Sequence, residues 1–264
     1  MSCPILKSVL IKQDKNTTTI LLNRPDKKNA LNDQLIGDLK EAFNYAKQND
    51  STKVVILSGT GNAFCSGADL SYMISLRENN FSDNVKDSKS LSDLYLKILN
   101  FPKPVIAKVV GPALAGGCGL ASVCDFVIAD ENAIFGYPEV KIGFVAAMVS
   151  VFLIKQIGER KARELLLTGK ILSASEALEC GLINKVIPES QIDKTIEQLI
   201  KDLEKNSPKA IQVTKEILSS FQYLENEKEI DRLAEINASF RQTDEFYEGL
   251  SAFLEKRKPT WTKI

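Results

Sequence analysis

The stretch GPALAGGCGLAS, residues 111–122, places four glycines among small side chains directly after the apolar run VIAKVV at 105–110. Glycine loses more conformational entropy on folding than other residues, so a cluster of it marks a place where the backbone approaches something closely. Four explanations are open: a phosphate loop, a contact face between membrane helices, a packing contact, and a catalytic pocket lined by backbone amides. Neither GxxxxGK[ST] nor GxGxxG occurs in the stretch, which argues against the phosphate loop.

Composition argues against several classes of partner. The 264 residues are 44% hydrophobic and 26% charged with a formal net charge of zero, which does not favour binding to nucleic acid or anionic lipid. Residues 105–124 approach the length of a membrane span, but Lys108 and Pro112 interrupt them. We therefore predict a buried strand, turn and helix there, and no membrane segment. The N-terminus shows no signal or anchor and the five cysteines form no CxxC pair, so we expect reduced thiols and a cytoplasmic location.

The chain contains no histidine. This excludes Ser-His-Asp and Cys-His mechanisms, HExxH zinc sites and histidine proton shuttles within one chain. Acid–base chemistry must then come from Asp, Glu, Lys, Tyr, Cys or a bound cofactor.

Hydrophobic periodicity predicts an α/β protein whose last part is helical. Strands are predicted at 8–12, 18–23, 53–58, 104–111, 125–129 and 133–136, with one further extended segment at 182–188. Helices are predicted at 32–48, 90–99, 145–157, 159–167, 174–180, 191–205, 207–219, 228–241 and 243–256. Residues 71–90 are polar with scattered apolar positions, so we expect a mobile segment. We place a core at 1–195 and a C-terminal helical region at 196–264.

A second glycine-containing loop, GTGNAFCSGADL at 59–70, also follows a buried strand. Two backbone amides, one from each loop, could converge on one oxygen and form an oxyanion hole. Such a donor contributes about 3–4 kcal/mol to transition-state stabilisation in well-studied enzymes. If only one of the two clusters were present, close packing would be the better explanation.

Several motifs together resemble the enoyl-CoA hydratase/isomerase (crotonase) superfamily. They run in the family's order along nearly the whole chain: NRPDKKNALN (23–32), FCSGADL (64–70), GPALAGGCGLASVCDFVIA (111–129), FGYPEVKIGF (135–144), LLLTGKILSASEALECGLINKVIP (165–188) and FLEKRKPTW (253–261). The resemblance implies a spiral of ββα units followed by helices that form a trimer, with two trimers stacking into a hexamer. It also implies an acyl-CoA thioester substrate, no metal and no cofactor beyond the coenzyme A of the substrate.

By the same resemblance, the amides of Ala68 and Gly116 form the oxyanion hole. The implied substrate-binding residues are Lys28 and Ala30 near the adenine and ribose, and Ser66, Gly67, Asp69, Leu70 and Gly117 along the pantetheine path and the hole. For Asp69 we favour a role as a helix cap. Arg257 and Lys258 either reach the coenzyme A phosphates or form a solvated tail.

The carboxylates decide the reaction class. Hydratases of this superfamily use two glutamates, and only the second is present here, as Glu139 in YPEVKIG; Gly119 occupies the position of the first. An apolar flank (Phe144, Val145 and Met148) would raise the pKa of Glu139 and suit it to proton transfer near neutrality. The resemblance favours an enoyl-CoA hydratase with Glu139 as acid/base, and the methylglutaconyl-CoA hydratases are one type that it includes.

Other functions remain open. Glu139 alone would suit Δ3-Δ2-enoyl-CoA isomerisation, and the same oxyanion hole would suit thioester hydrolysis or C–C cleavage. A non-catalytic acyl-CoA-binding protein is a further alternative. We interpret Cys118 and Tyr137 as packing residues and Asp125 as the start of a strand.

Overall fold

A computed structural model describes residues 3–223 and 227–262 of the chain. The first element is the antiparallel hairpin of β1 (Val9–Asp14) and β2 (Thr17–Leu22), in the region predicted for two strands. Alternate residues of β2 are buried, and its three buried side chains are Thr18, Ile20 and Leu22. This is the pattern of a strand with one face on the core.

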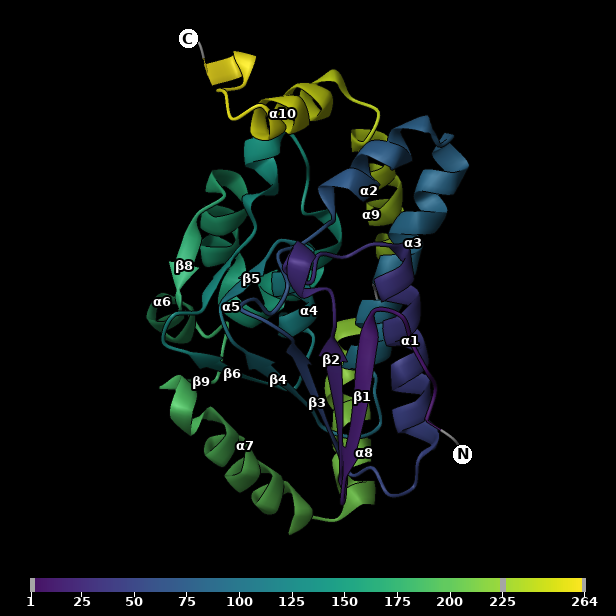
Figure 1. Cartoon of the computed structure of the whole chain (residues 1–264), viewed down its shortest axis with the longest axis vertical. Helices are drawn as coiled ribbons and strands as arrows, with labels where there is room; N and C mark the ends of the chain where they lie inside the picture. Colours follow the sequence, from purple (N-terminus) through teal and green to yellow (C-terminus); the bar gives the residue numbers. More distant parts are fainter. Residues whose placement is uncertain (1–2, 224–226, 263–264) are drawn as a thin grey trace.

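Two sheets form the centre of the molecule (Figure 1). The larger has the order β1-β2-β3-β4-β6-β9, and from β2 onward neighbouring strands are parallel. Its later strands are β3 (Val54–Gly59), β4 (Val105–Val109), β6 (Phe126–Asp130) and β9 (Lys185–Ile187). The smaller sheet consists of β5 (Pro112–Leu114), β7 (Ile134–Gly136) and β8 (Ile171–Ser173). Parallel neighbours need crossover connections, which accounts for the helices between them.

The helices of the first half are α1 (Asp33–Gln48), α2 (Leu70–Ser75), α3 (Phe81–Leu99) and α4 (Gly116–Ser122), with short 3-10 turns η1 (Pro25–Lys27), η2 (Leu76–Glu78) and η3 (Pro138–Ile142). The prediction of a mobile segment at 71–90 is wrong, because α2, η2 and most of α3 lie there. The side chain of Asn80 caps α3, and its first turns bury the polar residues Asn84 and Ser88. A buried face made of polar side chains gives no hydrophobic periodicity.

The later helices are α5 (Ala147–Thr168), α6 (Ala174–Glu179), α7 (Glu189–Glu204), α8 (Pro208–Tyr223), α9 (Glu227–Phe240) and α10 (Asp244–Leu254), followed by η4 (Thr260–Thr262). The two helices predicted at 145–157 and 159–167 correspond to α5, which is kinked at Gly158 (φ 75°). Strand β8, which lies between α5 and α6, is not among the predicted strands.

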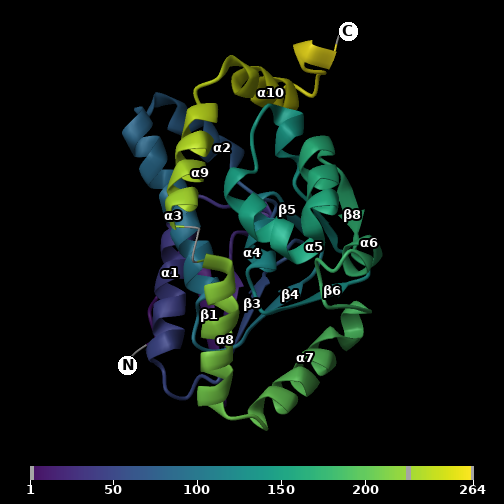
Figure 2. The same cartoon turned by 180° about the vertical axis from the view of Figure 1, so that it is seen from behind.

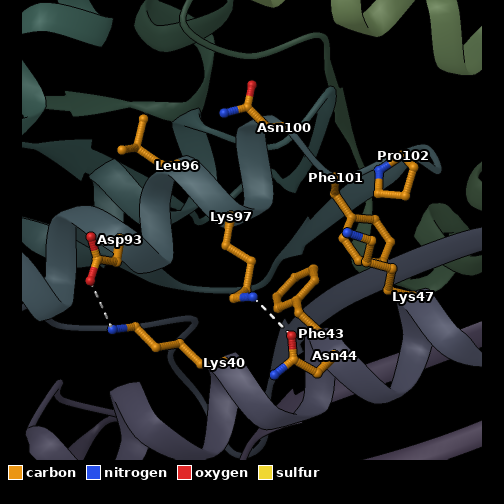
Figure 3. A pocket seen from close by; sticks show the side chains of 10 residues that line it. All are labelled: Lys40, Phe43, Asn44, Lys47, Asp93, Leu96, Lys97, Asn100, Phe101 and Pro102. Atoms are coloured by element: carbon orange, nitrogen blue, oxygen red, sulfur yellow. Dashed lines mark hydrogen bonds and ion pairs between the residues drawn. The ribbon is translucent and has the colours of Figure 1, made fainter. Parts of the chain in front are cut away.

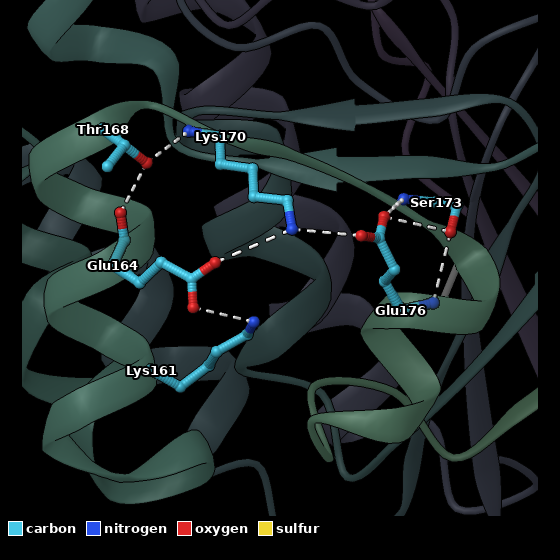
Figure 4. A network of polar contacts seen from close by, with 6 residues as sticks. All are labelled: Lys161, Glu164, Thr168, Lys170, Ser173 and Glu176. Carbon is cyan, nitrogen blue, oxygen red and sulfur yellow. Dashed lines mark hydrogen bonds and ion pairs between the residues drawn. The ribbon is translucent and has the colours of Figure 1, made fainter.

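Polar contacts hold the short strand β8 between its neighbouring helices (Figure 4). The Nζ atom of Lys170 lies 3.6 Å from Glu164 of α5 and 3.1 Å from Glu176 of α6. Ser173 and Glu176 form a reciprocal capping box at the start of α6. These local contacts define where α5 ends and α6 begins.

The C-terminal part is helical, as predicted, and part of it covers the core. The predicted boundary at 195/196 falls inside α7, and residues 1–2, 224–226 and 263–264 of the two predicted regions lie outside the described residues. Both views place α9 beside α3 (Figures 1 and 2), and α10 packs on η3. None of the helices in the described part of the chain has the length and apolar character needed to cross a membrane.

Candidate active site

A cavity of about 770 Å³ lies among η1, α2, α3, the start of α4, η3, α9 and α10. Of the residues predicted from the sequence, those that line it are Lys28, Ala30, Ser66, Ala68, Asp69, Leu70, Gly116 and Glu139. They come from four segments far apart in the chain. The apolar flank expected around Glu139 also lines the cavity, through Phe144, Val145 and Met148.

The two glycine loops touch each other. Cys65 forms a parallel bridge with Ala113, and a Cβ atom on Gly67 would lie 2.7 Å from the Cβ of Ala115. A Cβ on Gly117 would lie 2.2 Å from the Cys65 carbonyl oxygen. Gly67 and Gly117 are not among the cavity-lining residues; they allow the backbones to approach.

This contact places two candidate amide donors on one cavity. Leu31 donates to Gly67 O (2.7 Å) and accepts from Asp69 N (2.8 Å), so the N–H of Ala68 takes part in neither of these bonds. Gly116 is the first residue of α4, where backbone N–H groups have no partner within the helix. The glycines can therefore both allow close packing of the two loops and leave backbone N–H groups free to face the cavity.

Glu139 lies in the first turn of η3. Its Oε2 atom is buried and has no hydrogen-bond partner. Burial raises the pKa of Glu139 to about 7, and a backbone hydrogen bond offsets only part of the effect. A carboxyl group with this pKa can both accept and donate a proton near neutral pH.

Asp69 is the N-cap of α2, as expected: it accepts from the amides of Ser71 (3.0 Å) and Tyr72 (3.4 Å). Its other oxygen forms an ion pair with Arg24 at 2.8 Å. Burial by itself would raise the pKa of Asp69, but the Arg24 hydrogen bond and these amides hold it below its usual range. Asp69 therefore stays ionised and stabilises its loop.

The space beside Gly119 is occupied. A Cβ atom at this position would lie 2.5 Å from Cγ1 of Val149 and 3.0 Å from the hydroxyl oxygen of Tyr95. Tyr95 lines the cavity, is fully buried, and donates to the carbonyl of Gly116 at 2.8 Å. The tyrosine hydroxyl thus lies close to where a side chain at position 119 would begin.

One wall of the cavity is formed by α3, whose residues are not among the predicted site residues. Asp87, Leu91 and Tyr95 are spaced four residues apart and all line the cavity, as side chains on one helix face do. Arg241, which follows α9, lines it too and forms an ion pair with Asp87 at 2.6 Å. The spacing of Asp87, Leu91 and Tyr95 could have been recognised in the sequence as one helix face. The pairing of Asp87 with Arg241 could not, because the two residues lie far apart in the sequence.

Arg257 lines the cavity and forms ion pairs with Glu248 and Glu255, both at 2.6 Å. The hydrogen bonds that Arg257 donates to the carboxylate of Glu248 are the main reason why the pKa of Arg257 is raised. Lys258 is exposed. Arg257 is thus paired and faces the cavity, so the two predicted roles for this tail stay open.

The residues assigned to packing lie in the core or at a strand start. Cys118 and Tyr137 are buried, and burial raises the pKa of Cys118 to about 12, so it remains a thiol. Asp125 directly precedes β6, accepts from the amide of Val105, and pairs with Lys215.

A second hollow of about 510 Å³ lies between α1 and the C-terminal half of α3 (Figure 3). Two of its three lysines have polar partners: Lys40 lies 3.6 Å from Asp93, and Lys97 donates to Asn44 at 2.8 Å. Within the described residues, no group of three or more Cys, Asp or Glu side chains is placed to hold a metal ion.

Comparison with known proteins identifies the family. Residues 12–263 match the family described as enoyl-CoA hydratase/isomerase. A Thermus thermophilus protein provisionally named an enoyl-CoA hydratase is 39% identical over 92% of this chain and 96% of its own length. The 2,3-dehydroadipyl-CoA hydratase of Escherichia coli is 32% identical over 96% of this chain and 98% of its own.

A solved structure agrees with the sequence matches. The enoyl-CoA hydratase/isomerase of Xanthobacter autotrophicus superposes with a TM-score of 0.88 at 28% identity, covering 95% of this chain and 94% of that one. The α/β architecture with its helical C-terminal part is therefore the crotonase fold. The chain belongs to the enoyl-CoA hydratase/isomerase family.

Proposed function

We propose that the protein hydrates a 2-enoyl-CoA thioester with Glu139 as its one carboxylate acid/base. The observation that carries the proposal is the buried, unpartnered Oε2 atom of Glu139, on the same cavity as Ala68 and Gly116. A raised pKa of about 7 supports proton transfer by this group in both directions near neutrality. Names of similar proteins, which are hydratases of acyl-CoA thioesters, support the same reaction class.

The proposed reaction proceeds through an enolate. The thioester carbonyl oxygen accepts hydrogen bonds from the amides of Ala68 and Gly116, which stabilise the negative charge that develops on it. Ionised Glu139 removes a proton from a water molecule as the water oxygen bonds to Cβ, and the C=C electron pair moves into the enolate. Glu139 then returns the proton to Cα. One O–H bond breaks, and one C–O and one C–H bond form.

Tyr95 would supply the second acceptor for that water. Burial raises the pKa of Tyr95 well above its usual value, so the group remains a neutral hydroxyl. Its proton is donated to the Gly116 carbonyl, which leaves an oxygen lone pair to accept a hydrogen bond from water. In this proposal the tyrosine orients the water, and Glu139 alone moves the proton.

Residues at the cavity mouth would hold coenzyme A. Lys28 and Ala30 line the cavity beside η1, and Ser66 and Leu70 line the path inward. Arg257 offers a cation for a phosphate, because its guanidinium faces the same cavity. We propose these residues as the binding path for the carrier and its pantetheine arm.

One observation favours a second function. A site with a single carboxylate can remove a proton from Cα of a 3-enoyl-CoA to give a dienolate and return the proton at Cγ, which is Δ3-Δ2 isomerisation. Glu139 and the two amides would suffice for it. The role of Tyr95 distinguishes the reactions, since isomerisation needs no oriented water.

The test measures both reactions on purified protein with crotonyl-CoA, 3-methylglutaconyl-CoA and a 3-enoyl-CoA, by thioester absorbance and product mass. We expect a 3-hydroxyacyl-CoA product from a 2-enoyl substrate. In Tyr95→Phe, hydration should fall about tenfold, as for the loss of one hydrogen bond to the reacting water, while Cα proton exchange of butyryl-CoA in D2O is retained. Tyr45→Phe, in α1, is the matched control. Binding without turnover of any substrate would refute the enzyme assignment.

A further inference from the structure

The far end of the cavity contains a polar cluster that the hydration mechanism does not use. It consists of Tyr72 from α2, Asp87 from α3, and Asn237 and Arg241 from α9 and its C-terminal end, all of which line the cavity. These three helices lie together in both overall views (Figures 1 and 2). The surrounding wall is largely apolar, so the cluster marks a distinct part of the site.

The cluster lies well away from the reacting atoms. Asp87 and Tyr95 are eight residues apart on one face of α3, which corresponds to a rise of about 12 Å along the helix. Tyr95 contacts Gly116 at the oxyanion end. A thioester with its carbonyl at Gly116 would therefore extend its acyl group along this face toward Asp87.

One donor in the cluster has no acceptor. Arg241 pairs with Asp87 at 2.6 Å, and its guanidinium also donates weakly to the Asn84 carbonyl at 3.4 Å. The side chain of Arg241 is 7% exposed, and its Nε–H has no hydrogen-bond partner. Leaving such a donor unpaired in a buried place is costly, so an oxygen atom arriving with the substrate would be favoured there.

The charges of the cluster determine which kind of substrate oxygen, carboxylate or hydroxyl, would bind beside Arg241. Arg241 and Asp87 neutralise each other, and Tyr72 donates its hydroxyl proton to Asp87. The amide of Asn237 is already engaged, accepting from Ser88 at 3.0 Å and donating to the Val145 carbonyl at 3.3 Å. A carboxylate would bring a second negative charge beside Asp87, with one arginine between them, and would lose its hydration. A hydroxyl accepts from Nε–H without adding charge.

We propose that this cluster binds the end of the acyl chain, and that the preferred substrate is an enoyl-CoA of about six to eight carbons with a neutral hydroxyl group at its far end. The inference rests on the proposed acyl-CoA function of the cavity. A plain alkyl end would leave Arg241 Nε unpaired, whereas a hydroxyl would pair it.

The test uses saturated thioesters, which bind without reacting. Dissociation constants are measured by calorimetry for octanoyl-CoA, 8-hydroxyoctanoyl-CoA and the ω-carboxylate octanedioyl-CoA, and for the six-carbon series. We expect the hydroxy compound to bind at least about tenfold more tightly than the alkyl compound, with the carboxylate weaker than the hydroxyl. Equal binding of hydroxyl and alkyl ends, or tightest binding of the carboxylate, would overturn the proposal.

A matched pair of double variants assigns the effect to the cluster. Arg241→Gln/Asp87→Asn removes the buried pair but keeps its approximate volume, and should abolish the hydroxyl preference. Lys89→Gln/Asp231→Asn removes another ion pair between α3 and α9, with its partners at 2.8 Å and largely exposed, and should leave the preference intact. If the first variant does not fold, as judged by circular dichroism, Tyr72→Phe replaces it and should reduce the preference several-fold. Persistence of the preference in the folded variant would contradict the assignment.

Crotonyl-CoA separates this proposal from the proposed function, because its acyl group is too short to reach Arg241. Hydration of crotonyl-CoA without any hydroxyl preference refutes the subsite alone. A hydroxyl preference in binding without turnover of any enoyl-CoA refutes the hydratase alone.

Discussion

Asp69 and Glu139 are carboxylates on the wall of one cavity, but their surroundings move their pKa values in opposite directions. Asp69 lies in a loop that supplies Arg24 and two backbone amides as partners, and these outweigh its burial. Glu139 lies on a turn against apolar side chains, and its Oε2 has no partner. Burial raises the pKa of both carboxylates, but the partners of Asp69 outweigh it, whereas Glu139 has only a backbone hydrogen bond to oppose a stronger desolvation.

Glu139→Gln should have the largest effect on activity. The amide keeps the shape of the side chain but cannot accept and return a proton, so we expect kcat/KM for crotonyl-CoA to fall about 10³-fold. Glu131→Gln, at an exposed position after β6, is the matched control and should retain full activity. Full activity of the Glu139 variant would show that another group moves the proton.

The pH dependence of stability gives the second largest effect. The pKa of Glu139 is raised from 4.5 to about 7 in the folded state, so the folded protein binds this proton more tightly than the unfolded chain does. The contribution of Glu139 to the free energy of unfolding should therefore decrease as pH rises from about 4.5 to 7, by up to about 3 kcal/mol. Urea unfolding across this range, in wild type and Glu139→Gln, measures the difference. Parallel curves for the two proteins would contradict the assigned pKa.

Gly119→Ala tests the packing that leaves Glu139 without a second carboxylate. The added Cβ would press on Val149 and on the Tyr95 hydroxyl, so we expect about 2 kcal/mol of destabilisation. Gly37→Ala in α1 is the control, because nothing lies within 4 Å of its added Cβ and alanine favours a helix. A thermal melt compares both variants with wild type. An unchanged melting temperature for Gly119→Ala would show that Val149 and Tyr95 can shift to make room for the added Cβ.

Asp69→Asn should have the smallest effect on catalysis. The variant loses the ion pair with Arg24 but keeps a side-chain oxygen for the cap, so we expect about 1 kcal/mol of lost stability and only a few-fold change in kcat/KM. Because the folded-state pKa of Asp69 is lowered, the advantage of wild type should be present at neutral pH and disappear as pH falls below the ordinary range of an aspartate. A large loss of kcat with normal stability would give Asp69 a chemical role.

Sequence patterns predicted most of the fold because most elements have a regular hydrophobic period or a cap. Hairpin β1–β2, the parallel strands and the C-terminal helices follow from such local signals. Four features did not follow. The short helix α2 and the first part of α3 lie where a mobile segment was expected, and α3 buries polar side chains there. The strands β5 and β8 have three residues each and show no periodic signal.

The candidate site likewise contains residues that the sequence predicted and contacts that it did not. Motifs predicted the amide positions Ala68 and Gly116 and the lone Glu139, which all line the cavity, and the cap at Asp69, which the structure confirms. Each of these predictions depends on residue type and short-range spacing. The sequence also indicated that Gly119 could not carry a catalytic side chain. Only the folded structure brings Tyr95 and Val149 against Gly119, and Arg241 against Asp87. Those contacts join residues of α3 and α5 to residues far from them in the chain. They depend on how the helices pack, which short stretches of sequence do not encode.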